Sequence, residues 1–149
     1  MKTESTNLTR TRLVVLVVLA ALALSALVLS RGVRGRLSLP FRVETSEGRQ
    51  AYLHALGWEI DPASEDVRET SVPAKLDDMM TQYNDMQRSQ GFDLTPYLGK
   101  PVTVVTYTLS DGSPEAGALI TLWICDGVVI AGDVHTPAMD GYMHGIIKE

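Results

Sequence analysis

The sequence predicts an α+β domain with an antiparallel sheet of four or five strands and two packed helices, preceded by one N-terminal transmembrane helix. Three observations support this prediction. Residues 13–30 form an uncharged run rich in Leu and Val. Residues 46–56 and 73–91 place apolar side chains at helical spacing. Asp126-Gly127 joins two apolar runs and is a pair that favours a tight hairpin turn.

The apolar run at residues 13–30 is long enough to cross a membrane as an α-helix. At about 1.5 Å per residue it covers roughly 27 Å, close to the ~30 Å hydrocarbon core of a bilayer. A cleaved signal peptide is the alternative, but its apolar region is typically about 7 to 15 residues long and ends at its cleavage site. An uncleaved anchor fits the longer run better. The chain then divides into a tail (1–12), a transmembrane helix (13–30), a linker (31–45) and a domain (46–149).

The number of basic residues does not decide the orientation of this span, because three Lys or Arg residues lie close to it on each side. The short tail lacks foldable content, so we expect it to stay in the cytoplasm while the much longer domain is translocated. This places the protein in the cell membrane as a single-pass protein with its C-terminal domain outside the cytoplasm. The small pairs Ala21/Ser25 and Ala26/Ser30 have a spacing that could pack two spans into a weak dimer.

The domain is strongly acidic. From Val43 onward there are 6 Lys or Arg residues and 17 Asp or Glu residues, which argues against nucleic acid as a partner and favours a cation or a basic protein. A solubilising role of this acidity is the simpler interpretation. Cys125 is the only cysteine, so no disulfide can form within the chain and stability must come from a packed core.

Residues 46–56 are predicted to form the first helix of the domain. Thr45 or the residue after it can cap the N-terminus, and Gly57 follows the end. Residues 58–60 then alternate apolar and polar side chains, which favours a short strand. Asp61-Pro62 is expected to close that strand.

The next part of the chain predicts an edge strand and a second helix. Residues 67–72 carry several polar or charged side chains, as an exposed edge strand does. Pro73 is expected to start the helix and Gly91 to end it. Three methionines recur on one side of this helix, and core packing is a better interpretation than a soft-metal site or an adaptable binding surface: Met79, Met80 and Met86.

The second half of the domain predicts most of the sheet. Residues 92–100 read as a compact turn, and residues 102–109 as a strand rich in Val, Thr and Tyr. After a turn at residues 110–114, two apolar strands at 116–125 and 128–135 form a hairpin through Asp126-Gly127. Both faces of this hairpin are largely apolar, so we expect it to lie centrally in the sheet.

The turn also predicts the register of the hairpin: Cys125 with Val128, Trp123 with Ile130, Thr121 with Gly132 and Leu119 with Val134. Asp133 would then share the other face with residues such as Ile120 and Leu122. A buried carboxylate needs hydrogen bonds or a positive partner, because burial without one costs several kcal/mol.

Candidate functional residues concentrate in the stretch that starts at Asp133 and also contains His135, Asp140 and His144. Carboxylate and imidazole groups suit Zn, Mn or Fe by ligand type, but the spacing matches no fixed metal motif. The structural alternative is that Asp133 and Asp140 bind loop amides while His144 packs on the sheet edge. We also expect Asp133 and His144 to lie close together, so that the carboxylate of Asp133 raises the pKa of His144. No catalytic residues are assigned, since Cys125 has no partner base and no nucleophile motif is present.

Three phrases resemble a family of small bacterial proteins known only as a domain of unknown function: YLHALGWE at 52–59, GFDLTPYLGK at 91–100, and AGDV with DGYMHG between 131 and 145. The resemblance implies one N-terminal span and an extracytoplasmic domain, and covers nearly the whole chain. It also implies that Asp133, Asp140, Gly141 and His144 share one loop. Ala131 stands where the family has a second glycine. The resemblance implies no activity.

These observations favour a membrane-anchored, extracytoplasmic binding or interaction module that is not an enzyme and needs no cofactor. Its expected contacts are the membrane, through residues 13–30, and a protein partner or a cation. The alternative is a metal-binding protein or metal-dependent enzyme that uses Asp133, Asp140 and His144.

Overall fold

The structure is a computed structural model that describes residues 42–138 and 140–147. The predicted tail (1–12), transmembrane helix (13–30) and most of the linker lie outside the described residues. Across the described ranges, no helix is long and apolar enough to cross a membrane.

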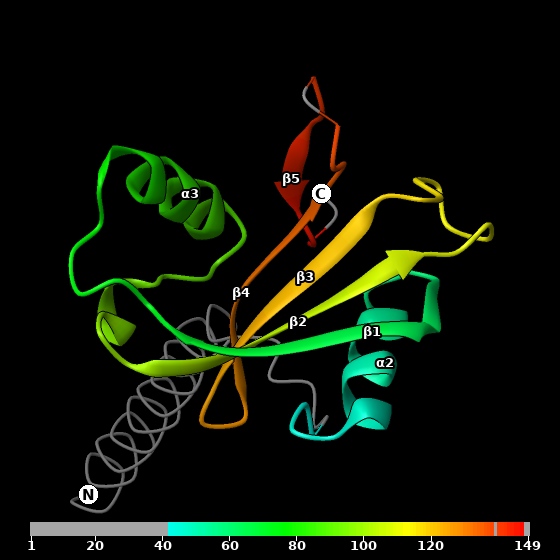
Figure 1. Cartoon of the computed structure of the whole chain (residues 1–149), viewed down its shortest axis with the longest axis horizontal. Coiled ribbons are helices and arrows are strands. Elements are labelled where there is room, and N and C mark those ends of the chain that lie inside the picture. Colours follow the sequence, from blue (N-terminus) through cyan, green and yellow to red (C-terminus); the bar gives the residue numbers. More distant parts are fainter. Residues whose placement is uncertain (1–41, 139, 148–149) are drawn as a thin grey trace, which may run out of the picture. The chain divides into compact units, whose positions relative to one another are not determined.

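The domain is a five-stranded antiparallel meander with two helices (Figure 1). The elements in chain order are α2 (Ser46–Ala55), β1 (Ile60–Ser71), α3 (Asp78–Ser89), the short 3-10 helix η1 (Thr95–Tyr97), β2 (Pro101–Leu109), β3 (Leu119–Cys125), β4 (Val128–His135) and β5 (Met143–Gly145). The strands lie in the sheet in the order in which they occur in the chain, so β3 is central. This confirms the predicted α+β class, the number of strands and the two helices.

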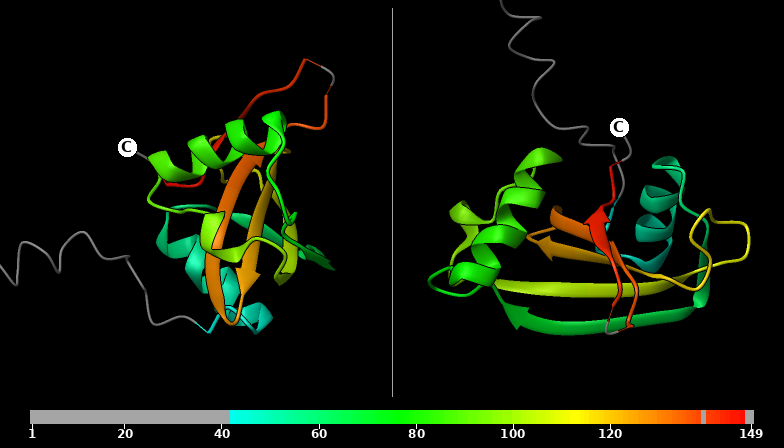
Figure 2. Two further views of the ribbon diagram at one scale, coloured as in Figure 1. Left: turned by 90° about the vertical axis from the view of Figure 1, so that its left-hand side faces the viewer. Right: turned by 90° about the horizontal axis from the view of Figure 1, so that it is seen from above.

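The sheet buries apolar side chains on both faces, and each helix covers one of them. On the first face, called here the α2 face, Tyr52 and Leu53 of α2 pack on alternate residues of the sheet such as Leu122. On the opposite face, called the α3 face, Met80 and Tyr83 pack with Leu94 on residues of β2, β3 and β4. The two helices lie near opposite ends of the strands (Figure 2). Each face therefore has its own core and its own helix.

The first helix forms as predicted because its end signals are local. The side chain of Thr45 accepts a hydrogen bond from the backbone N–H of Gly48 at 3.1 Å, and this caps the N-terminus of α2. Gly57 follows the helix with a φ of 83°, which glycine adopts at little cost. Arg49 of α2 forms a buried ion pair with Glu65 of β1 at 2.7 Å and so ties the helix to the sheet.

The two short strands predicted around Asp61-Pro62 are a single strand, and this prediction was wrong. β1 runs from Ile60 to Ser71 at the edge of the sheet, and its pairing with β2 shifts between Asp61 and Asp66. Pro62 lies inside this irregular part. An edge strand tolerates proline because its outward N–H has no ladder partner to lose, and a bulge absorbs the change in direction.

The second helix also differs from its prediction. It begins at Asp78 with Asp77 as its N-cap, not at Pro73, because the Asp77 side chain accepts a hydrogen bond from the Met80 N–H at 2.8 Å. The expected methionine stripe is not the innermost part, since the side chain of Met79 is 78% exposed. The buried residues of α3 are Asn84 and Gln87. These polar groups are buried because they bind backbone groups elsewhere in the fold.

The β3–β4 hairpin has the predicted turn but not the predicted register. Asp126 and Gly127 have φ values of 49° and 71°, as a type I′ turn requires, and Cys125 pairs with Val128. A shift near Ile130 then moves every later pair by one residue, so Thr121 lies opposite Asp133 instead of Gly132. The bulge carries Asp133 onto the α3 face, with Trp123 and Thr121, instead of the face expected from the turn.

Candidate functional site

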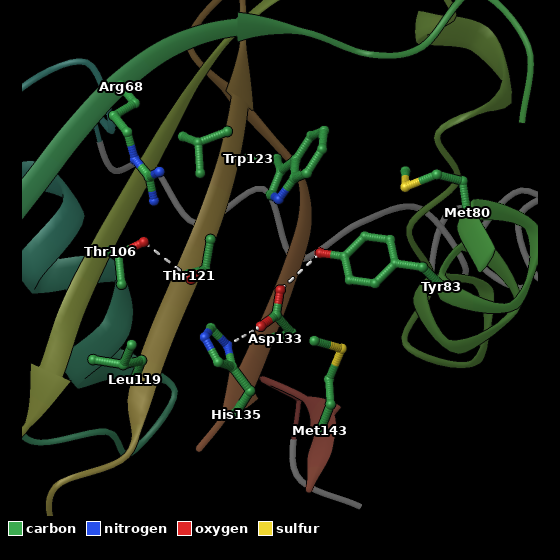
Figure 3. A pocket seen from close by; sticks show the side chains of 11 residues that line it. Arg68, Met80, Tyr83, Thr106, Leu119, Thr121, Trp123, Asp133, His135 and Met143 are labelled. Carbon is green, nitrogen blue, oxygen red and sulfur yellow. Dashed lines mark hydrogen bonds and ion pairs between the residues drawn. The ribbon is translucent and has the colours of Figure 1, made fainter. Parts of the chain in front are cut away.

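A cavity of about 300 Å³ lies on the α3 face, between α3 and the strands (Figure 3). Its walls are largely apolar side chains, among them Leu119, Met80 and Met143. Polar side chains from four different elements face the same space: Arg68 from β1, Tyr83 from α3, Trp123 from β3, and Asp133 and His135 from β4. Apolar walls with a few convergent polar groups are typical of a ligand site.

Asp133 is the buried charge at the base of this site, with 3% of its surface exposed. Its Oδ1 accepts a hydrogen bond from the Tyr83 hydroxyl at 2.8 Å, and its Oδ2 lies 2.7 Å from Nδ1 of His135. Burial, and after it the charge of Asp133, raise the pKa of Tyr83 far above its ordinary value. The hydroxyl therefore keeps its proton and acts as a donor to the carboxylate. The sequence prediction that Asp133 needs partners is correct, but those partners are side chains and not loop amides.

The contact with Asp133 determines which nitrogen of His135 is available. An ionised carboxylate accepts hydrogen bonds and cannot donate them, so Nδ1 carries the proton that it shares with Asp133. Nε2 makes no hydrogen bond to any residue in the described part of the chain. It is an acceptor when the ring is neutral and a donor when the ring is protonated. The pair thus presents one adaptable nitrogen to the cavity.

Trp123 and Arg68 add donors on the other side of the site. The Trp123 ring lies 6.0 Å from the Tyr83 ring, and its indole nitrogen has no hydrogen-bond partner among the residues described. Arg68 uses Nε to bind Asp66 at 3.0 Å, which leaves both terminal nitrogens of its guanidinium for other contacts. The Thr106 and Thr121 hydroxyls on the cavity wall bind each other at 3.1 Å.

Two glutamines hold α3 against β4 beside Asp133. Gln87 binds both backbone groups of Gly132, with Oε1 accepting from the N–H at 2.9 Å and Nε2 donating to the carbonyl at 3.1 Å. Gln90 donates to the same carbonyl at 3.0 Å and accepts from the Ile147 N–H at 3.0 Å. β5 pairs with β4 only from Asp133 onward, so these side chains take the place of a neighbouring strand at Gly132.

His144 lies on the α2 face, away from the cavity. It pairs with Val134 across β4 and β5, and its ring stacks against Tyr142 and Trp58. Its Nε2 lies 2.8 Å from the Glu115 carboxylate. Burial lowers the pKa of His144, but the hydrogen bonds to Glu115 and to the Gly145 carbonyl and the charge of Glu115 outweigh burial, so its pKa is raised.

The structure therefore separates the residues proposed as metal ligands. Asp133 and His144 project from opposite faces of the sheet and do not form the expected close pair, because their ion-pair partners are His135 and Glu115. The charge of Asp133 still makes the smallest of the contributions that raise the pKa of His144. Asp140 is exposed in the turn before β5. Among residues 42–138 and 140–147, no three His, Cys, Asp or Glu side chains lie close enough to hold a metal ion. Cys125 is buried, and burial raises the pKa of its thiol.

Asp133 and His135 were both among the candidates predicted from the sequence, and as residues i and i+2 of a strand they share a face. Tyr83, Trp123 and Arg68 were not predicted as parts of the site. These three come from distant parts of the chain and meet only through the strand register.

Comparison with protein families matches residues 52–133 to the family described as "Domain of unknown function (DUF4830)". The match runs from α2 to Asp133 and includes Arg68, Tyr83 and Trp123. No curated protein and no solved structure matches the chain. Because the match covers more than half of its length, the chain belongs to this family of domains of unknown function.

Proposed function

We propose that this protein is a membrane-anchored binding module whose domain lies outside the cytoplasm and takes a small ligand in the cavity of the α3 face. One observation carries the binding proposal: the cavity is lined by hydrogen-bonding groups that the fold itself does not use, the indole nitrogen of Trp123 and Nε2 of His135. Both side chains are half-buried, and these two atoms remain open to the cavity, where a ligand can reach them. The uncharged run at residues 13–30 supports the anchor.

Binding accounts for the site better than catalysis does. The Asp133–His135 pair has the geometry of an oriented general base, which would need a nucleophile or a bound water in line with it. The hydroxyls of Thr106 and Thr121 are engaged with each other. The Cys125 thiol is buried and contacts the carbonyl of Pro101 at 3.6 Å. These contacts engage the two threonine hydroxyls that line the cavity and the only thiol of the chain.

The two tryptophans of the chain provide a direct test of binding. In the full-length protein, labelled with ¹⁵N-tryptophan and reconstituted in nanodiscs, the indole signals of Trp58 and Trp123 can be followed while a library of small molecules is added. The Trp58 indole donates to the Ile146 carbonyl at 2.8 Å in the core of the α2 face and serves as an internal control. We expect ligands to shift the Trp123 signal and to leave the Trp58 signal unchanged. A library that moves neither signal, or both together, contradicts binding in this cavity.

The anchor and its orientation are tested separately. We expect the protein to remain full length in membranes, and protease added outside intact cells to digest the domain. A shortened soluble product would show that a signal peptidase removes residues 13–30. A protected domain would place it in the cytoplasm.

A further inference from the structure

Resting on the proposed binding function, we infer that the cavity of the α3 face recognises a small monocarboxylate with an apolar body, which Arg68, Trp123 and His135 bind through its carboxylate. The three residues come from β1, β3 and β4 and surround one cavity (Figure 3). The antiparallel register brings them together, because β1, β2, β3 and β4 are successive neighbours in the sheet.

The side chains around the cavity offer a ligand more hydrogen-bond donors than acceptors. An indole N–H and a guanidinium can only donate hydrogen bonds, so Trp123 and Arg68 require an acceptor on the ligand. The strong acceptor of the site, Asp133, is already bound by Tyr83 through one oxygen and by His135 through the other. With Asp133 occupied, two groups in the described part of the cavity can only donate to a ligand, the indole of Trp123 and the guanidinium of Arg68. Nε2 of His135 joins them as a donor when the ring carries both protons.

The positive charge of Arg68 favours an anionic ligand. The guanidinium of Arg68 contacts Asp66 through Nε alone, and its two terminal nitrogens form the fork that fits a carboxylate. His135 faces the same space with Nδ1 held by Asp133, so its Nε2 can donate to the ligand whenever the ring carries both protons. A neutral acceptor would satisfy the hydrogen bonds but would gain less from the charge of Arg68.

The acidity of the domain favours an anion with a single charge. The domain carries 17 acidic and 6 basic residues from Val43 onward, so its surface repels polyanions at long range. Repulsion between exposed charges is screened over about 8 to 10 Å at physiological salt, and a monoanion held directly by Arg68 is affected much less.

The walls of the cavity determine the rest of the ligand. About 300 Å³ is at the small end of the range for ligand cavities, and Val104, Leu119, Met80 and Met143 contribute apolar surface. Methionine side chains adapt to ligands of different shape. These dimensions favour a compact aliphatic or aromatic acid.

Three probes of one shape separate the alternatives: 3-phenylpropionate, its neutral amide and the corresponding amine, 3-phenylpropylammonium. Each is titrated into the full-length protein in nanodiscs, with the Trp123 indole signal and calorimetry as readouts and empty nanodiscs as a blank. We expect the carboxylate to bind about tenfold or more tightly than the amide, as a charge-assisted contact implies, and the amine to bind most weakly.

Variants of the protein assign the contacts. Arg68→Gln should remove most of the preference for the carboxylate over the amide. Trp123→Phe, which deletes the indole N–H and keeps an aromatic ring, should weaken binding of both probes. The matched control is Arg42→Gln, because Arg42 is exposed, lies outside the cavity and carries the same charge. The control should leave the preference unchanged.

The outcomes distinguish this inference from the binding function beneath it. If the amide or the amine binds as tightly as the acid and shifts the Trp123 signal, carboxylate recognition is wrong and the binding module stands. If none of the probes shifts that signal at about 5 mM, where even a millimolar ligand fills most of a site, carboxylate recognition is also wrong. The binding function fails as well only if the library leaves the Trp123 signal unmoved or shifts it together with the Trp58 signal.

Discussion

Gln87 and Gly132 are joined by two hydrogen bonds, in which the side-chain amide of one residue binds both backbone groups of the other. The side chain of Gln87 is fully buried, and Gly132 precedes Asp133 in β4. This contact fixes α3 against the strand that carries the Asp133–His135 pair. The rigidity of the cavity therefore depends on a glutamine that does not line it.

Replacing Gln87 by Leu should destabilise the domain by about 1 to 3 kcal/mol, because the buried N–H of Gly132 loses its partner. Amide hydrogen exchange at Gly132 should accelerate as well. Chemical unfolding of the full-length protein, followed by tryptophan fluorescence, measures the first effect, and NMR measures the second. Gln82→Leu, at an exposed position of the same helix, is the control and should leave both nearly unchanged.

Tyr83→Phe should lower the free energy of unfolding by about 1 to 2 kcal/mol, since Asp133 loses one of its two donors while the ring remains in place. Tyr97→Phe is the matched control, because the Tyr97 ring packs in the same core without a hydrogen bond from its hydroxyl to any described residue. Equal unfolding midpoints for the two variants would mean that the Tyr83–Asp133 bond contributes nothing measurable.

Gly127→Val should destabilise the domain by about 1 kcal/mol or more. Position 127 has a φ of 71°, which a β-branched residue resists, and a Cβ there would also meet the side chain of Glu44. The control is Gly112→Ala, where φ is not positive and a Cβ has room. Thermal unfolding by circular dichroism compares the two, and an unchanged midpoint in Gly127→Val would reject the type I′ turn.

Stability should fall as the pH rises from about 6 to 8, through the pair of His144 and Glu115. The pKa of His144 is raised in the folded state, so its contribution is fully present below the unfolded value of ~6.5 and is lost as the pH rises through the folded value. Glu115→Gln should remove the largest part of this pH dependence and leave the smaller part that comes from the Gly145 carbonyl and the charge of Asp133. The control is Glu59→Gln, which removes the carboxylate beside the exposed ring of His54.

The same measurement tests whether Glu115, and not Asp133, is the main partner of His144. If Asp133→Asn removed the pH dependence of His144 and Glu115→Gln did not, the assignment of Glu115 would be wrong. NMR titration of the His144 ring in both variants gives the answer independently of stability.

The parts of the fold that the sequence predicted correctly are those with local causes. Thr45 caps the helix that follows it, and Asp126-Gly127 forms its turn through backbone angles that few other pairs adopt. The bulge at Ile130 escaped prediction because a turn determines only the pairs beside it. Where a strand shifts register depends on what its side chains pack against, and for β4 that includes α3, more than forty residues earlier in the chain.

In the candidate site, too, only the features with local causes were predictable from the sequence. A buried carboxylate at Asp133 with a need for partners was predictable from the apolar strand around it. Its partner Tyr83 lies fifty residues away in the chain, where its ring packs in the core and its hydroxyl binds Asp133. Arg68 was assigned to an exposed edge strand, which is correct, but its place beside the cavity depends on the pairing of three strands.

Because of its bulge, β4 should tolerate the deletion of one residue better than the insertion of one. A regular hairpin from the Asp126-Gly127 turn would place Asp133 opposite Ile120, on the α2 face, and the one extra residue at Ile130 moves it opposite Thr121. Deleting one residue between Val128 and Asp133 could be absorbed by losing the bulge, with Asp133 and His135 still in the cavity. Inserting one residue would require a second irregularity or would turn both side chains to the other face. Among members of the family that keep this cavity, β4 should therefore vary by loss of a residue before Asp133 more readily than by gain of one.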